Sequence, residues 1–189
     1  GDPVLTPLEH AADFSEKIAQ LPHCYEPTDE LREHPATSTR AEAGLPEDAF
    51  VYACFNQSYK ITEPVFSRWC RILERVPGSV LWLLVPQAHI QAALREQAIA
   101  RGIAPERVIF APFVKPTEHL ARLPLADLFL DTFPYGAHTT CSDALWMGLP
   151  VLTQVGRSFS ARVAASLLNA VGLPEMAVDN ERAYEERAV

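Results

Sequence analysis

Short apolar runs rich in β-branched and aromatic residues alternate with helical stretches through most of this 189-residue chain. The predicted strands are Phe50–Cys54, Val80–Val85, Val108–Phe110, Leu128–Leu130 and Val151–Thr153. The predicted helices are Pro64–Val76, His89–Arg101, Glu118–Leu123, Ser142–Met147 and Ser160–Val171. Such alternation favours an α/β fold, in which a parallel sheet is covered by helices on both faces.

The same order of elements predicts a Rossmann-like sheet and the edge at which a ligand binds. Ligands of such sheets lie outside the carboxyl ends of the strands, so the loops after Cys54, Phe110 and Leu130 are expected to converge there. The first 48 residues are instead rich in Pro, Glu, His and Thr, and only Pro7–Leu21 looks regular. We therefore expect an initial helix and an inter-lobe linker over residues 1–48, and a Rossmann-like lobe over residues 49–189.

Composition narrows the classes of partner. A net charge of -8 argues against a broad nucleic-acid surface, although a local basic pocket for a phosphorylated small molecule is compatible with it. No apolar run approaches the ~20 residues that span a bilayer, and the amino end lacks a signal-peptide pattern. We therefore expect no membrane association and a cytoplasmic location. Because the chain starts at Gly1, we also expect that it is a piece of a longer protein.

The cysteines and histidines give no metal or disulfide pattern. The four cysteines are widely spaced, and we expect free thiols. The histidines show no paired metal spacing, so no protein-bound metal is predicted. Cys141 lies near a predicted helix start, where a lowered thiol pKa would make it nucleophilic, but nothing nearby except His138 completes such a pair.

The loop after Leu130 has the composition of an anion site. Thr139, Thr140 and Ser142 can each cap the following helix, whose first-turn amides have no intrahelical partner and carry partial positive charge. A phosphate suits this position, and His138 adds a further donor. The alternative is that the threonines only cap the helix and His138 is an ordinary loop residue.

The other two loops offer complementary groups. Gln57 and Lys60 follow the first strand, and an amide and an ammonium there can bind phosphate oxygens, whereas a solvated lysine is the alternative. The loop after Phe110 offers exposed backbone at Val114, an imidazole at His119 and a guanidinium at Arg122. His119 can stack on a nucleobase and Arg122 can reach its carbonyl oxygen; otherwise they are surface residues of a helix. The chain has neither a Gly-x-x-x-x-Gly-Lys nor a Gly-x-Gly-x-x-Gly motif, so a P-loop nucleotidase or a standard dehydrogenase is not supported.

Several segments, taken together, resemble the carboxy-terminal catalytic lobe of the O-linked N-acetylglucosamine transferase and SPINDLY family. They are Phe55-Asn-Gln-Ser-Tyr-Lys60, Pro77-Gly-Ser-Val-Leu-Trp-Leu-Leu84, Arg107-Val-Ile-Phe110, Leu130-Asp-Thr132, Gly136-Ala-His-Thr-Thr140, Asp143-Ala-Leu-Trp146 and Ser160-Ala-Arg-Val-Ala-Ala-Ser166. The similarity runs roughly from Pro7 to the end. It implies the GT-B fold, of which this chain is the donor-nucleotide lobe, and an upstream lobe preceded by tetratricopeptide repeats.

The resemblance also implies a role for each candidate residue. Lys60 and Gln57 would contact the diphosphate, with Lys60 as the catalytic group that neutralises the leaving nucleoside diphosphate. His138, Thr139 and Thr140 match the diphosphate-binding loop. Asp143 matches a carboxylate that holds the ribose. The residues around the uracil would be Val114, His119 and Arg122. One departure is Pro116, which stands where the family has a lysine, so only the backbone contact of Val114 carries over and a side-chain contact from Lys115 does not.

The activity implied is inverting, metal-independent transfer of N-acetylglucosamine from UDP-GlcNAc to Ser or Thr of an acceptor protein or peptide, with the UDP-sugar as donor substrate and no cofactor. Two alternatives share the fold or the site. One is the same lobe in a protein O-fucosyltransferase that uses GDP-fucose or in an N-glucosyltransferase that uses UDP-glucose; the other is a non-catalytic nucleotide-binding module. Because the family's first lobe is missing, we expect this chain to bind donor without completing transfer.

Overall fold

The sheet is parallel throughout, as predicted. The computed structural model describes residues 1–29 and 31–189 and contains one six-stranded sheet in the order β3-β2-β1-β4-β5-β6. The strands are β1 (Val51–Cys54), β2 (Val80–Leu83), β3 (Val108–Phe110), β4 (Leu128–Leu130), β5 (Val151–Gln154) and β6 (Ala177–Val178). Every neighbouring pair is parallel. The strand order reverses direction between β1 and β4, which makes their carboxyl ends the topological switch point of the sheet.

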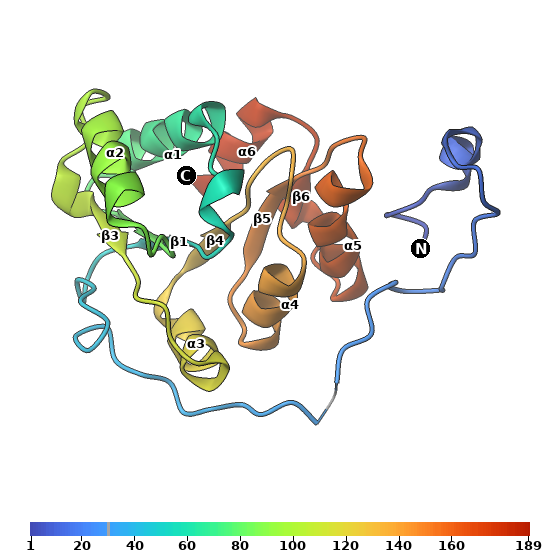
Figure 1. Ribbon diagram of the computed structural model, residues 1–189, viewed down its shortest axis with the longest axis horizontal. Helices are drawn as coiled ribbons and strands as arrows, with labels where there is room; N and C mark the ends of the chain where they lie inside the picture. Colours follow the sequence, from blue (N-terminus) through green and yellow to red (C-terminus); the bar gives the residue numbers. More distant parts are fainter. Residues whose placement is uncertain (30) are drawn as a thin grey trace.

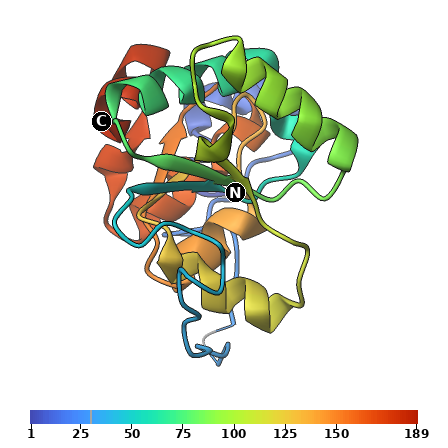
Figure 2. The same ribbon diagram turned by 90° about the vertical axis from the view of Figure 1, so that its left-hand side faces the viewer.

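Helices cover both faces of this sheet. They are α1 (Glu63–Arg75), α2 (Ala88–Ile99), α3 (Pro116–Arg122), α4 (Thr139–Trp146), α5 (Val163–Ala170) and α6 (Glu181–Ala188). Figure 1 shows α1, α2 and α6 together on one side of the sheet, with α3 and α4 on the other. Figure 2, turned by 90°, shows the same two layers of helices with the strands between them.

Buried apolar side chains explain why the strands form where the sequence predicts them. All four residues of β1 and of β2 are buried, and the largest fully buried side chains include Trp69 on α1 and Trp82 on β2. A strand covered on both faces must be apolar at every position, so it is recognisable as a continuous apolar run. The predicted bounds of β3 and β4 agree with the structure, and those of β1, β2 and β5 differ by one or two residues.

Four elements depart further from the prediction, one of which is α5 (Val163–Ala170), predicted to begin at Ser160. β6 and α6 follow the last predicted helix and were not expected. Helix α4 begins at Thr139 rather than at Ser142, with His138 as its N-cap and no side-chain cap hydrogen bond. The prediction that Thr139, Thr140 and Ser142 cap this helix was therefore wrong, because the threonines already form its first turn.

The amino-terminal segment wraps around the lobe instead of forming a long helix. Among residues 1–29 and 31–48 the one regular element is a short 3-10 helix, Leu8–Asp13, where we expected regular structure over Pro7–Leu21. The buried Asp2 carboxylate accepts a hydrogen bond from Ser166 on α5 at 2.6 Å. Further along, the segment passes α4 and then α3 before it enters β1 (Figure 1), and the Ser38 amide donates to the Ala121 carbonyl at 3.3 Å.

No helix in the described part of the chain is both long and apolar enough to cross a bilayer.

Candidate functional site

The three predicted loops converge at the switch point, where an open cavity of about 680 Å³ lies between the loops after β1 and β3 and helices α3 and α4. This volume is within the usual range for small-molecule sites. Six of the nine candidate residues line it, from the loops after β1 and β3 and from α3 and α4: Gln57, Val114, His119, Arg122, Thr140 and Asp143. The remaining lining residues are Phe55, Leu84, Phe113, Lys115, Pro116 and Glu118. We call this the switch-point cavity.

One end of the switch-point cavity is built around a buried arginine. Arg122 is 6% exposed, its Nη1 donates to the Pro112 carbonyl at 2.7 Å, and its guanidinium lies 4.7 Å from the centre of the Phe55 ring. Its Nη2 lies 2.9 Å from Nδ1 of His119. Burial lowers the pKa of Arg122 to about 10, which still leaves it protonated near neutral pH. Nη1 and Nη2 of Arg122 are thus engaged by the protein and orient His119, while the buried Nε has no hydrogen-bond partner among the described residues.

The environment of His119 favours a neutral imidazole. Burial and the adjacent Arg122 charge lower the pKa of His119 to about 4. A neutral ring with an unprotonated Nδ1 accepts the Arg122 hydrogen bond, and a protonated ring cannot. A flat, uncharged ring held at a cavity wall suits stacking against a nucleobase.

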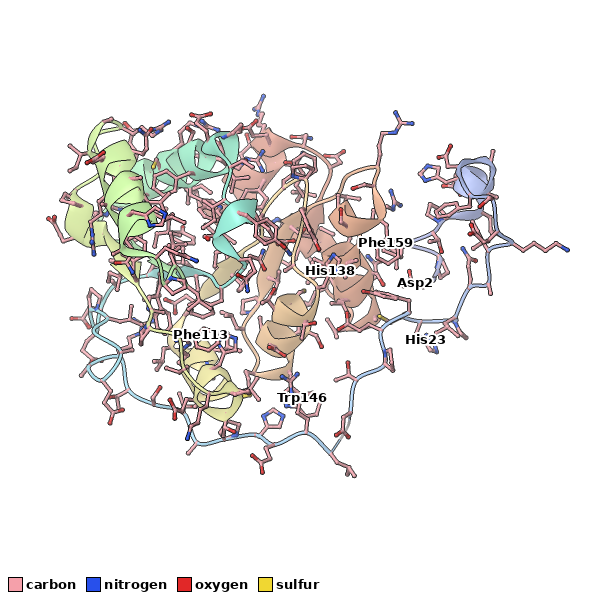
Figure 3. All side chains as sticks on the ribbon, viewed as in Figure 1. Asp2, His23, Phe113, His138, Trp146 and Phe159 are labelled. Carbon is pink, nitrogen blue, oxygen red and sulfur yellow. The ribbon has the colours of Figure 1, made fainter. Side chains whose placement is uncertain are left out.

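Asp143 already has a partner that the sequence did not reveal. Its buried carboxylate pairs with the guanidinium of Arg32 from the amino-terminal segment, and its Oδ2 lies 3.9 Å from Nε2 of His119. Nearby, the His34 ring stacks on Trp146 at the end of α4, with ring centres 4.7 Å apart. Figure 3 shows Trp146 at the foot of α4, next to the passing segment. The amino-terminal segment therefore lies against Asp143 and the end of α4, although none of its described residues lines the switch-point cavity.

Three candidate residues lie beside the cavity rather than in its lining. Thr139 is exposed on the first turn of α4. Lys60 donates from Nζ to the Gly136 carbonyl at 2.8 Å and lies 3.8 Å from the centre of the Tyr135 ring. Burial lowers the pKa of Lys60, while the nearby Asp131 charge acts in the opposite direction. Lys60 is therefore held directly against the loop that precedes α4.

His138 lies in an aromatic environment next to this lysine. Its ring is 5.5 Å from that of Tyr135 and 6.3 Å from that of Phe159, and Figure 3 shows His138 and Phe159 on neighbouring segments. Burial and the charge of Lys60 lower the pKa of His138. Its Nε2 is buried and has no hydrogen-bond partner among the described residues. His138 therefore carries a buried nitrogen without a partner directly before the first turn of α4.

Sequence reasoning missed two polar residues that lie directly behind the site. Asn56 and Asp131 are 1% and 2% exposed, and they hydrogen-bond to each other. The Thr140 hydroxyl, expected to face a phosphate, donates to the amide oxygen of Asn56. A signal was present, because each residue ends or closely follows an apolar strand, at the edge where polar groups of a parallel sheet gather.

The cysteine at the start of α4 is not an activated nucleophile. All four are free thiols, as predicted. Cys141 is fully buried, and burial raises its pKa well above the usual range, so the alternative of an activated thiol at the start of α4 is wrong. Among the described residues, no group of three His, Cys, Asp or Glu side chains is placed to hold a metal ion.

Comparison with known proteins gives a consistent family. The model of glycosyl transferase family 41 matches residues 26–189. The chain is 41% identical over 195 residues to the probable UDP-N-acetylglucosamine–peptide N-acetylglucosaminyltransferase SEC of Arabidopsis thaliana, covering all of this chain and 20% of that protein. It is 37% identical over 171 residues to the UDP-N-acetylglucosamine–peptide N-acetylglucosaminyltransferase of Caenorhabditis elegans, covering 90% of this chain and 15% of that protein. A probable SPINDLY transferase of Solanum lycopersicum is 32% identical over 183 residues, covering 92% and 19%.

A solved structure supports the same assignment. A mutant O-GlcNAc transferase of Thermobaculum terrenum superimposes with a TM-score of 0.86 at 31% identity, covering all of this chain and 36% of that one. The fold is thus that of the carboxy-terminal lobe of a GT-B glycosyltransferase, and the chain spans about a fifth of the length of the curated relatives it matches. The sheet, the arrangement of the loops and the sequence similarity along all of this chain agree. This chain belongs to glycosyltransferase family 41.

Proposed function

We propose that this chain is the donor-binding lobe of an inverting, metal-independent transferase that moves N-acetylglucosamine from UDP-GlcNAc to Ser or Thr of a protein. The observation that carries the proposal is the switch-point cavity, where the loops after β1 and β3 and helices α3 and α4 gather six of the candidate residues. The names of the relatives in Arabidopsis and Caenorhabditis support the donor and the acceptor class.

The donor would lie along the switch point with its base near α3 and its diphosphate near α4. In this pose the uracil stacks on His119, with Arg122 behind that ring and the Val114 backbone beside it. The Asp143 carboxylate takes the ribose hydroxyls, for which Arg32 must move away. A neutral His119 fits this role, because a charged ring would compete with the ribose for the same carboxylate.

The diphosphate would meet donors from two loops. Thr139 and Thr140 are on the first turn of α4, where unpaired amides and the helix dipole favour an anion. Gln57 and His138 add an amide and an imidazole. Lys60 would donate to a phosphate oxygen in place of the Gly136 carbonyl. This change requires only a movement of the flexible lysine side chain.

In the proposed reaction an acceptor hydroxyl attacks the anomeric carbon as the bond to the β-phosphate oxygen breaks, with inversion at that carbon. The proton of the attacking hydroxyl passes to a base on the upstream lobe, and the electron pair of the broken bond goes to the leaving UDP. Negative charge therefore grows on the β-phosphate, next to Lys60 and the α4 amino terminus. Fixed donors aimed at developing charge are the usual means of stabilising such a transition state, and here they would take the place of a metal ion.

Acceptor binding and full turnover would need more protein than this lobe. We propose an upstream lobe across the cleft and tetratricopeptide repeats before it, which together would bind the acceptor protein. The four free thiols favour a reducing compartment, and we propose the cytoplasm.

A binding panel tests the proposal. Calorimetry and thermal shift with UDP, UDP-GlcNAc, UDP-glucose, GDP and GDP-fucose should give the strongest stabilisation with the uridine nucleotides, since a ligand that binds only the native state raises its stability. Stronger binding of GDP and GDP-fucose would favour a fucosyltransferase lobe instead. Absence of any response would contradict the donor-binding role.

A further inference from the structure

A buried carboxylate lies directly behind the loop that joins β4 to α4. Oδ1 of Asp131 accepts hydrogen bonds from the Thr132 amide at 2.7 Å, the Ala137 amide at 2.7 Å and the Asn56 side chain at 3.0 Å. Its Oδ2 accepts from the Thr153 hydroxyl at 2.7 Å. One side chain thus ties together both ends of the loop at 132–137 and the loop after β1.

Asn56 extends this arrangement to the helix that follows. Its Nδ2 donates to Asp131 and, at 2.8 Å, to the Thr132 hydroxyl. Its Oδ1 accepts the hydroxyl of Thr140 on the first turn of α4. Both ends of the amide are therefore engaged, and each end accepts or donates as its chemistry allows.

The loop has little freedom to move while these contacts persist. A Cβ added to Gly136 would lie 2.9 Å from Oδ2 of Asp131 and 3.2 Å from the Ser160 carbonyl, so the backbone passes close to both. The Gly136 carbonyl is also the acceptor for Lys60. The position of Asp131 therefore determines where the Lys60 ammonium rests and where α4 begins.

The negative charge of Asp131 is by itself unfavourable close to a site for an anion. A buried carboxylate costs several kcal/mol unless it is well hydrogen-bonded, and its charge repels a diphosphate. Four donors offset part of that cost, although burial still raises the pKa of Asp131. The carboxylate is therefore best explained by the geometry that it imposes. If Asp131 only stabilised the turn at the end of β4, fewer hydrogen bonds would be enough. The contact with Asn56, and through Asn56 with Thr140, would then not be needed.

We infer that Asp131 and Asn56 are positioning residues that hold the β4–α4 loop, the first turn of α4 and the Lys60 ammonium in the arrangement that receives a diphosphate. This inference rests on the proposed donor-binding function for its ligand, but the geometry itself can be tested without one.

The first measurement is amide hydrogen exchange of the 189-residue chain. In Asn56→Ala, exchange over residues 132–140 should become faster by about tenfold or more, because a buried hydrogen-bonded contact is lost. The matched control is Asn169→Ala, which removes an exposed amide that bonds only within α5 and should leave this loop unchanged. Asp131→Ala removes the acceptor of all four hydrogen bonds, so the same loop should exchange faster still.

The second measurement compares UDP with uridine. Asn56→Ala should weaken the binding of UDP by about tenfold or more. It should leave the affinity for uridine within about twofold of the wild-type value, since only the part of the site that binds phosphate is disturbed. Unchanged exchange over residues 132–140 in both variants would overturn the inference. Equal losses for UDP and uridine would also overturn it, because they would indicate general destabilisation. If wild-type chain bound no UDP, the proposed function would fail, and the exchange data would still decide the positioning role.

Discussion

The neutral state of His119 makes a quantitative prediction about acid stability. Its pKa is about 4 in the folded chain and about 6.5 when exposed, so between these pH values the unfolded state binds more protons. Stability from this residue is therefore fully present above about pH 6.5 and is lost as the pH falls toward 4. At about 1.4 kcal/mol for each pH unit, the difference corresponds to an upper limit of about 3 kcal/mol.

The test is urea unfolding of wild type and His119→Gln at intervals from pH 7.5 to pH 4. Carboxylates titrate in the same window, but they do so in both proteins and cancel in the difference. The wild-type free energy of unfolding minus that of the variant should fall by up to about 3 kcal/mol across the range. His89→Gln, on the exposed surface of α2, is the matched control and should run parallel to wild type. A constant difference for His119→Gln would show that this ring is not held neutral by burial and Arg122.

Three further outcomes follow from the site. Arg32→Ala should tighten UDP binding by about two- to fivefold, because Asp143 no longer exchanges an ion pair for ribose, and weaker binding would mean that Arg32 itself contacts the nucleotide. In an extended protein with the upstream lobe, Lys60→Ala should lower the turnover rate by a factor of about 10²–10³, with a smaller loss of donor affinity. Lys60→Arg should restore only part of this rate. Near-normal turnover of both variants would remove Lys60 from the mechanism. The 189-residue chain alone, given UDP-GlcNAc and an acceptor peptide, should form no product, and detectable transfer by mass spectrometry would contradict the need for a second lobe.

The sequence was most informative where burial alone determines structure. The β4 run Leu128–Leu130 is apolar at every position because both faces of the strand are covered, and its bounds were predicted correctly. Helix α6 was missed because most of its residues are charged and only Tyr184 and Ala188 are buried. The start of α4 was misplaced because the Asp131 carboxylate fixes the preceding Ala137 amide, a tertiary contact that no local pattern records.

The candidate site shows the same division. The predicted carboxyl ends of the strands indicated which segments meet at one edge of the sheet. His119, Thr140 and Asp143 were therefore expected at that edge, and all three line the switch-point cavity. Their partners were not predictable, since Arg32 reaches Asp143 across 111 residues of chain. Whether each residue contacts a nucleotide stays a prediction until binding is measured.

The carboxy-terminal helix bears on how short a nucleotide-binding version of this chain can be made. Every residue proposed to touch the donor lies at or before Asp143, so a truncation after β5 would keep them all. That truncation would nevertheless remove Tyr184, whose buried hydroxyl donates to the Asp131 carbonyl at 2.9 Å. It would also expose the Tyr52 hydroxyl of β1, which donates to the Ala188 carbonyl at 2.6 Å. A minimal fragment must therefore extend through α6, whose side chains support the floor of the site from the opposite face of the sheet.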